Sequence, residues 1–165
     1  MSATPTAVLT FEPALAVLLP ETHALLCSAN LVVHPAVARI VLAGSRGPAG
    51  GYRPDSDVDL SLVVETRLLP SDEPQRAALL RDVLRTTLDH WQGPVEADLA
   101  AVFERREGGL RAFDVQRYDA VLFPSGEIGF GVYKIQKGFT GYVPAHILQP
   151  ERMYPCLLIW RRRGT

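Results

Sequence analysis

The chain has 165 residues, of which 47% are hydrophobic and 21% charged, and its formal net charge at pH 7 is −1. This length is enough for one domain that buries about two-thirds of its unfolded surface, and the charge balance excludes a general polyanion-binding surface. No apolar run has the length of a membrane span and the start lacks a basic signal-peptide region, so we expect a soluble, cytoplasmic protein without membrane contact.

Two short helices are predicted before the first strand. Apolar residues recur at helical spacing from residue 13, and Pro20 interrupts the pattern, so two helices should meet there. The strand predicted next, Ile40-Val41-Leu42, leads into a turn at Gly44-Ser45. Cys27 and Cys156 lie in apolar surroundings far apart in the sequence, which favours two buried free thiols, with a disulfide between them as the alternative.

The turn after this strand has the composition of a phosphate-binding loop. Gly44 and Ser45 offer backbone N–H groups with little side-chain bulk around them, which suits an anionic phosphate. The glycine-rich loop that follows carries Arg46 and Arg53, either of which could add charge-assisted hydrogen bonds to phosphate. The alternative for both arginines is a plain solvent-exposed position.

Asp57 and Asp59 are one residue apart at the start of the next apolar run. Successive side chains of a strand point to opposite faces, so both carboxylates should share a face while Val58 and Leu60 point into a core. Two carboxylates so close together repel each other unless positive charge lies between them, and a divalent metal is the usual solution. A phosphate turn followed by paired carboxylates indicates a metal–nucleotide site.

These residues resemble the signature of a known superfamily. Gly44-Ser45 followed by Ser56-Asp57-Val58-Asp59-Leu60 is similar to the motif of the DNA polymerase β-type nucleotidyltransferases, in particular the minimal nucleotidyltransferases. Those are related to antibiotic adenylyltransferases and to antitoxins that modify a helical toxin. The likeness covers residues 40–64, and the loop from Arg46 onward departs from the Ala-Arg-Gly that minimal members commonly show. The resemblance implies an α+β (α/β) fold, with a mixed central sheet flanked by helices as in the polymerase β palm.

A helix and a third acidic strand follow. Ser71 or Asp72 should cap a helix that continues to Leu88, with its arginine-rich face in solvent. On the strand predicted from Val95 to Phe103, the resemblance requires a third carboxylate beside the Asp-x-Asp strand. Asp98 fits the family pattern best, and Glu96, on the same face, is the alternative. A third possibility is that both are ordinary charges of an edge strand.

The remaining third of the chain carries no recognised motif. A strand at 119–123, its hairpin partner at 128–135 and an edge strand at 156–160 are predicted. We treat residues 1–165 as a single nucleotidyltransferase domain with its core at about 30–103 and with strands and an extension of unknown role at 104–165.

The function that the resemblance implies is magnesium-dependent transfer of a nucleoside monophosphate from an NTP to a hydroxyl acceptor, with release of pyrophosphate. Gly44 and Ser45 would receive the β- and γ-phosphates, Asp57 and Asp59 would hold one Mg²⁺, and Asp98 would share a second. ATP is the expected nucleotide, and the acceptor would be a small molecule or a protein side chain.

Two other readings stay open. The chain could be an antitoxin-like or catalytically reduced protein that acts by binding a partner protein. The Asp-x-Asp pattern could also simply begin a strand. Extended nucleic acid is not an expected partner, because the chain is small and not basic.

Overall fold

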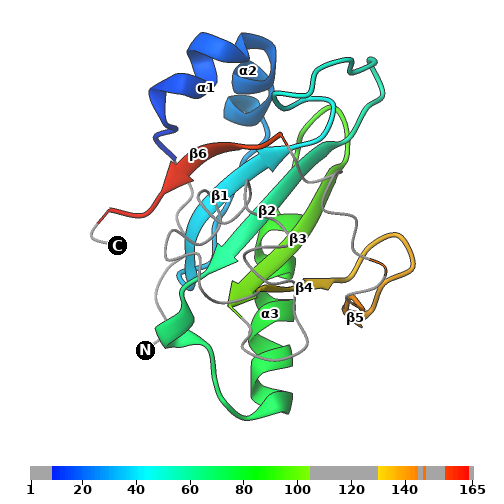
Figure 1. Ribbon diagram of the computed structural model, residues 1–165. Coiled ribbons are helices and arrows are strands. Elements are labelled where there is room, and N and C mark those ends of the chain that lie inside the picture. Colours follow the sequence, from blue (N-terminus) through cyan, green and yellow to red (C-terminus); the bar gives the residue numbers. More distant parts are fainter. Residues whose placement is uncertain (1–8, 105–129, 145–146, 148–154, 164–165) are drawn as a thin grey trace.

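The protein is built around one mixed β-sheet. The computed structural model describes residues 9–104, 130–144, 147 and 155–163 (Figure 1). Across the sheet, the six strands are β5 (Gly141–Tyr142), β4 (Phe130–Lys134), β3 (Ala97–Glu104), β2 (Val58–Val64), β1 (Val37–Ala43) and β6 (Leu157–Arg161). β2 and β3 are parallel, and the other neighbouring pairs are antiparallel. The expected α+β organisation with a mixed central sheet is confirmed.

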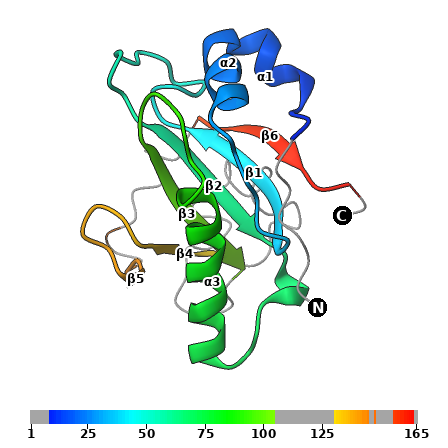
Figure 2. The same cartoon turned by 180° about the vertical axis from the view of Figure 1, so that it is seen from behind.

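The helices pack on one face of this sheet. They are α1 (Pro13–Leu18), α2 (Pro20–Ser28) and the long α3 (Glu73–Leu88), and a short 3₁₀ turn, η1 (Thr66–Leu68), follows β2. Figure 2 shows α3 crossing the sheet, with α1 and α2 at one end. Leu80 and Leu84 of α3 are fully buried against apolar strand residues such as Leu60 and Leu99. Burial of these side chains supplies the main driving force for this layer.

Local signals in the sequence explain where the helices begin. Pro20 starts α2, and a single residue, Leu19, separates it from the end of α1, so the predicted meeting of two short helices is confirmed. The Asp72 carboxylate accepts a hydrogen bond from the Gln75 N–H at 3.0 Å, which makes Asp72 the cap of α3. None of the helices in the described part of the chain is both long and apolar enough to cross a membrane.

The opposite face of the sheet carries a second apolar cluster. Val41, Val63 and Val102 lie in the middle of it, with Phe130 and Val132 of β4 beside them. Strand alternation requires this division, because residues on either side of each of these valines point to the helix layer. Side chains at odd positions of β2 and even positions of β3 therefore face away from α3.

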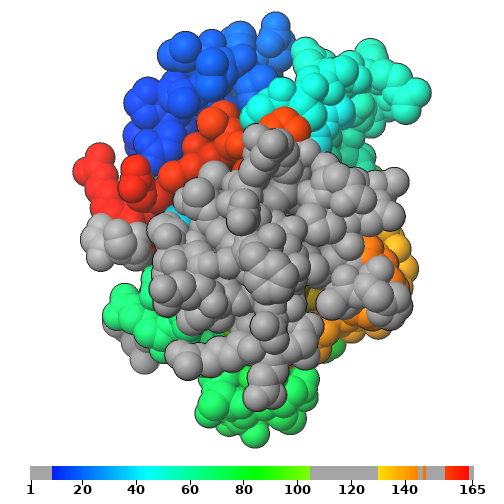
Figure 3. Space-filling model, in the orientation of Figure 1, coloured from blue at the N-terminus to red at the C-terminus, as the bar shows by residue number. Residues whose placement is uncertain are grey.

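Strands from the C-terminal third extend both edges of the sheet. β4 pairs with β3, and β6 pairs with β1, so the edge strand predicted at 156–160 is confirmed within one residue. β4 lies within the predicted segment 128–135, and its described neighbours are β3 and β5. The proposed partner segment 119–123 lies outside the described residues. Figure 3 shows β6, the N-terminal helices and the loop after β1 gathered at one end of the molecule.

Two smaller predictions need correction. The arginine-rich face of α3 is exposed at Arg81 and Arg85, as predicted, but Arg76 is partly buried. Arg76 donates to the Tyr142 hydroxyl and Arg81 to the Tyr133 hydroxyl, at 3.2 and 3.3 Å. Both cysteines are free, but Cys27 is exposed and Cys156 only partly buried, whereas both were predicted to be buried. Burial raises the pKa of the Cys156 thiol to about 11, so this thiol stays protonated at neutral pH.

Candidate functional site

The parallel pairing of β2 with β3 places two aspartates side by side. Asp59 is the register partner of Asp98, and the pairs on either side, such as Leu60 with Leu99, point into the helix-side core. Val58 and Leu60 are 0% and 2% exposed, as the alternation predicted. Asp59 and Asp98 therefore face away from α3, at the start of both strands.

Asp57 immediately precedes β2 and completes an acidic group with Asp59 and Asp98. Its side chain is 26% exposed, whereas that of Asp98 is 15% exposed. Glu96, the alternative third carboxylate, is an exposed residue just before β3, where its carbonyl oxygen accepts from the Val58 N–H at 3.0 Å. Of the two candidates, Asp98 is the one that lies opposite Asp59.

Two lysines neutralise this acidic group. The Lys134 ammonium lies 2.7 Å from Oδ1 of Asp98, and the Lys137 ammonium lies 2.5 Å from Oδ2 of Asp57 and 3.5 Å from Oδ2 of Asp98. Sequence reasoning missed both residues as members of the site. One signal was present, because these are the two lysines of a chain whose other basic residues are all arginines.

A glutamine side chain fixes the lysine-bearing turn beside Asp98. Gln136 donates through Nε2 to the Ala97 carbonyl at 2.8 Å and accepts through Oε1 from the Leu99 N–H at 3.0 Å. These are the backbone groups on either side of Asp98. Since the β3–β4 pairing ends at Ala101, the Gln136 amide continues the contact where main-chain pairing stops. The turn that carries Lys137 is thereby docked on β3.

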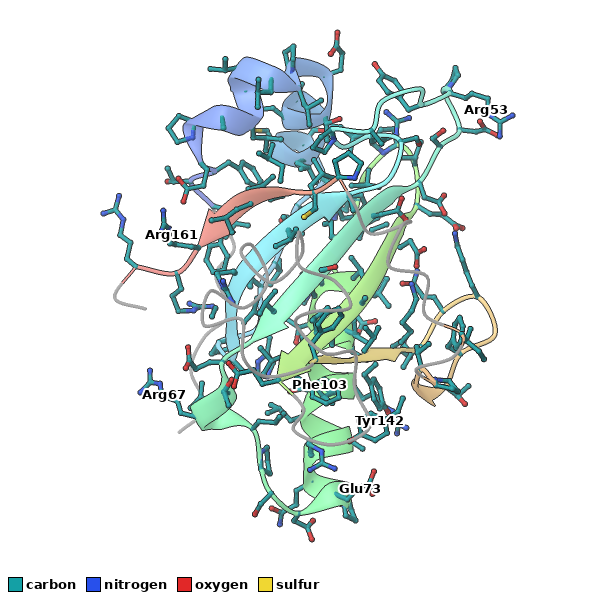
Figure 4. The ribbon with its side chains drawn as sticks, in the orientation of Figure 1. Arg53, Arg67, Glu73, Phe103, Tyr142 and Arg161 are labelled. Carbon is teal, nitrogen blue, oxygen red and sulfur yellow. The ribbon has the colours of Figure 1, made fainter. Side chains whose placement is uncertain are left out.

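Aromatic packing holds the base of the same hairpin. Tyr133 is 2% exposed, and its ring meets that of Tyr142 edge-on with centroids 5.1 Å apart. Phe103 of β3 packs against Tyr142 in the same manner at 5.8 Å (Figure 4). Arg76 and Arg81 of α3 bind the two tyrosine hydroxyls from the helix side. The long helix therefore supports the position of β4 and β5.

The environment of the carboxylates shifts proton affinity. Burial raises the pKa of Asp59 to about 6, and the charge and hydrogen bonding of the Asp98 carboxylate act in the same direction. Lys137 and Lys134 oppose this rise but do not cancel it. The hydrogen bond to Asp57 raises the pKa of Lys137 above its ordinary value. At neutral pH the acidic group therefore combines closely spaced negative charges with the ammonium groups of Lys134 and Lys137.

The Gly-Ser turn lies against the same carboxylates. Gly44 has φ of +73°, and a Cβ built on it would overlap Oδ2 of Asp59. Ala43, just before it, is the β1 register partner of Asp59. Ser45 is partly buried at the next position. The structure thus brings the predicted phosphate turn and the predicted carboxylates together.

The two loop arginines lie in different surroundings. Arg46 is 6% exposed and donates to the carbonyl oxygens of Ser56, Arg53 and Pro54 at 2.7, 3.2 and 3.1 Å. Its own carbonyl accepts from the Thr22 hydroxyl at 2.6 Å, which ties the loop to α2. Arg46 therefore braces the loop from within. Arg53 is exposed and points outward at the far end of the loop (Figure 4).

The described side chains do not form a finished metal cage. Among them, no group of three or more histidine, cysteine, aspartate or glutamate residues is arranged to hold a metal ion. The chemistry of the donor set nevertheless suits a hard cation, because Asp57 and Asp98 already share one positive charge through Lys137.

Comparisons with known proteins add no assignment. No family model matches the chain, and no curated protein or solved structure matches it either. The case for a function therefore depends on the geometry of the site and on the motif residues.

Replacing Gly44 with alanine should destabilise the protein more than replacing Gly50 does. The two glycines have nearly equal φ values, +73° and +71°, but an added Cβ meets Asp59 at Gly44 and nothing within 4 Å at Gly50. We expect Gly50→Ala to lower the free energy of unfolding by about 1 kcal/mol and Gly44→Ala to lower it by about 1–3 kcal/mol more. Urea denaturation measures both losses, and equal losses would contradict the close contact.

Neutralising Asp59 should stabilise the metal-free protein at alkaline pH. The folded-state pKa of about 6 exceeds the unfolded value, so the folded chain binds more protons between roughly pH 4 and 6. Wild-type stability therefore falls as pH rises through this window, and Asp59→Asn escapes that loss. We expect the variant to gain on the order of 1 kcal/mol at pH 8, after allowing for solvent screening, and little at pH 4.5.

Denaturation in the presence of a chelator at the two pH values measures this gain. Asp57→Asn is the matched control, because it removes the ion pair with Lys137 and should not stabilise the protein. An Asp59→Asn variant that is no more stable than wild type at pH 8 would show that the ionised Asp59 carboxylate does not destabilise the folded protein.

Proposed function

We propose that this protein is a magnesium-dependent nucleotidyltransferase that transfers a nucleoside monophosphate, with ATP as the expected donor, to a hydroxyl acceptor. One observation carries the proposal. The β2–β3 register pairs Asp59 with Asp98, and the Gly44 backbone lies against the Asp59 carboxylate. A turn suited to phosphate and carboxylates suited to a hard cation are thus in direct contact.

The donor set fits Mg²⁺ in its chemistry. Mg²⁺ prefers carboxylate oxygens and usually completes its coordination with water and substrate phosphates rather than with a full protein cage. Asp57, Asp59 and Asp98 are the residues that would hold it. When bound, the ion would neutralise charge on the phosphates and lower the pKa of the acceptor hydroxyl.

The transfer itself is a nucleophilic displacement at the α-phosphorus. The acceptor oxygen forms a bond to that phosphorus, while the bond from the α-phosphorus to the bridging oxygen of the β-phosphate breaks. Pyrophosphate leaves with the electron pair, and Asp98 takes the proton of the acceptor hydroxyl. The backbone N–H groups at Gly44 and Ser45 orient the β- and γ-phosphates, and Arg46 keeps the loop in shape.

The two loop arginines have distinct parts in this proposal. Arg46 contributes through the loop carbonyls it binds, because its guanidinium is turned to the loop interior. Arg53 is exposed and free to meet a nucleotide phosphate that approaches from solvent. The acceptor remains a small molecule or a protein side chain, since the described residues hold no feature that selects between them.

A second candidate is a protein of this architecture that acts mainly by binding a partner protein. The observation that favours it is the pair of lysines, which already neutralise Asp57 and Asp98 without any metal. Under this alternative the carboxylates have a structural role, and binding of triphosphate is absent.

Calorimetric titration with ATP, GTP, CTP and UTP, each with and without Mg²⁺, separates the two candidates. We expect Mg²⁺-dependent binding of at least one triphosphate, ATP first. Asp57→Asn and Asp59→Asn should reduce this binding strongly and abolish transfer while the fold survives, because positioning and electrostatics supply most of the rate in phosphoryl chemistry.

Asp82→Asn is the matched control, because this carboxylate is 66% exposed on α3, across the sheet from the site. It should bind nucleotide like wild type. Wild-type-like turnover in the Asp57 or Asp59 variant would refute the assignment. Absence of binding with every triphosphate would favour the second candidate.

A further inference from the structure

The two lysines of the site differ in how firmly they are held. The Lys134 side chain projects from β4 and is 18% exposed, with its ammonium on one Asp98 oxygen. The Lys137 side chain is 51% exposed and lies in the turn after β4, where Lys137 has φ of +54° and Gly138 of +88°. Lys134 is thus part of the sheet, whereas Lys137 reaches the carboxylates from a solvent-exposed turn.

The Lys137 ammonium occupies a position that a bound cation would take. It contacts both Asp57 and Asp98, whose carboxylates come from segments 41 positions apart in the sequence. Without any lysine contact, Asp57, Asp59 and Asp98 would repel each other across the start of two strands. Lys137 thereby performs the electrostatic task expected of a metal ion in this group.

Two cations of like sign cannot both hold the same carboxylate oxygens without strong repulsion. A divalent ion on Asp57 and Asp98 would therefore push the Lys137 ammonium away. Gln136 anchors the neighbouring backbone to β3, so a displaced Lys137 stays within a side chain's length of the site. The nearest new partner for its charge would be the polyphosphate of a nucleotide.

We propose that Lys137 is an intrinsic cation that competes with divalent metal for Asp57 and Asp98 and, once displaced, binds the nucleotide phosphates. This inference rests on the proposed function and adds a residue to it. In the metal-free protein Lys137 keeps the carboxylates neutralised. In the protein with metal and nucleotide bound, the same residue contacts the triphosphate. Its removal should therefore have opposite effects on the affinity for the metal and on the affinity for the nucleotide.

Mn²⁺ is the probe for the first effect, because the signal of free Mn²⁺ in electron paramagnetic resonance reports binding without nucleotide or turnover. Lys137→Gln should bind Mn²⁺ about tenfold more tightly than wild type, since a competing unit charge is gone. The second effect is measured by calorimetry with ATP at saturating Mn²⁺. There Lys137→Gln should bind ATP about tenfold more weakly.

Two control variants accompany this pair of titrations. Lys137→Arg keeps the positive charge and should stay close to wild type in both titrations. Arg67→Gln removes a charge that is 75% exposed beyond the other end of β2, and it should change neither affinity (Figure 4). If Lys137 had a purely structural role, Lys137→Gln would bind both Mn²⁺ and ATP more weakly.

Each outcome decides the proposal. Equal or weaker Mn²⁺ binding in Lys137→Gln overturns the competition, and ATP binding that is unchanged in this variant overturns the phosphate contact. In both cases metal-dependent nucleotide binding by wild type would leave the proposed function in place. Failure of wild type and Lys137→Gln alike to bind Mn²⁺ would refute the inference and the proposed function together.

Discussion

The site depends on the parallel register between β2 and β3, which sets Asp59 directly beside Asp98. Burial raises the pKa of Asp59 most, and the neighbouring Asp98 carboxylate raises it further, because two carboxylates at adjacent strand positions repel each other and disfavour ionisation. Without the rest of the structure, the repulsion between these two carboxylates would be uncompensated. The surrounding structure offsets it with positive charge, since Lys134 at the end of β4 and Lys137 in the turn after it bring two ammonium groups onto the acidic group.

The hairpin that supplies these lysines is held at the edge of β3 and from the helix side of the sheet. At the edge of β3, Gln136 binds the backbone on either side of Asp98. On the helix side, arginines of α3 bind the hydroxyls of Tyr133 and Tyr142. β4 therefore belongs to the site as well as to the sheet, and so does the turn that follows it. Lys134 and Lys137 thus adjust the charge of a site whose acidic residues lie earlier in the chain.

Much of the fold could be predicted from local patterns. Alternation of apolar residues placed Asp57 and Asp59 on one face, and the Asp72 cap and Pro20 marked helix starts correctly, because each signal acts within a few residues. The lysines were missed because Lys137 and Asp57 are 80 positions apart, and no local pattern encodes such a contact. Burial of Arg46 was missed for a similar reason, since carbonyl groups of a folded-back loop determine it.

The proposed function requires a metal ion that binds between the starts of β2 and β3, beside the Gly-Ser turn. Backbone amide resonances recorded during Mn²⁺ titration test this most directly, because the paramagnetic ion broadens signals close to it. We expect selective broadening at Gly44, Asp59 and Asp98, with η1 at the other end of β2 unaffected. Broadening centred elsewhere, or absent at millimolar Mn²⁺, would contradict it.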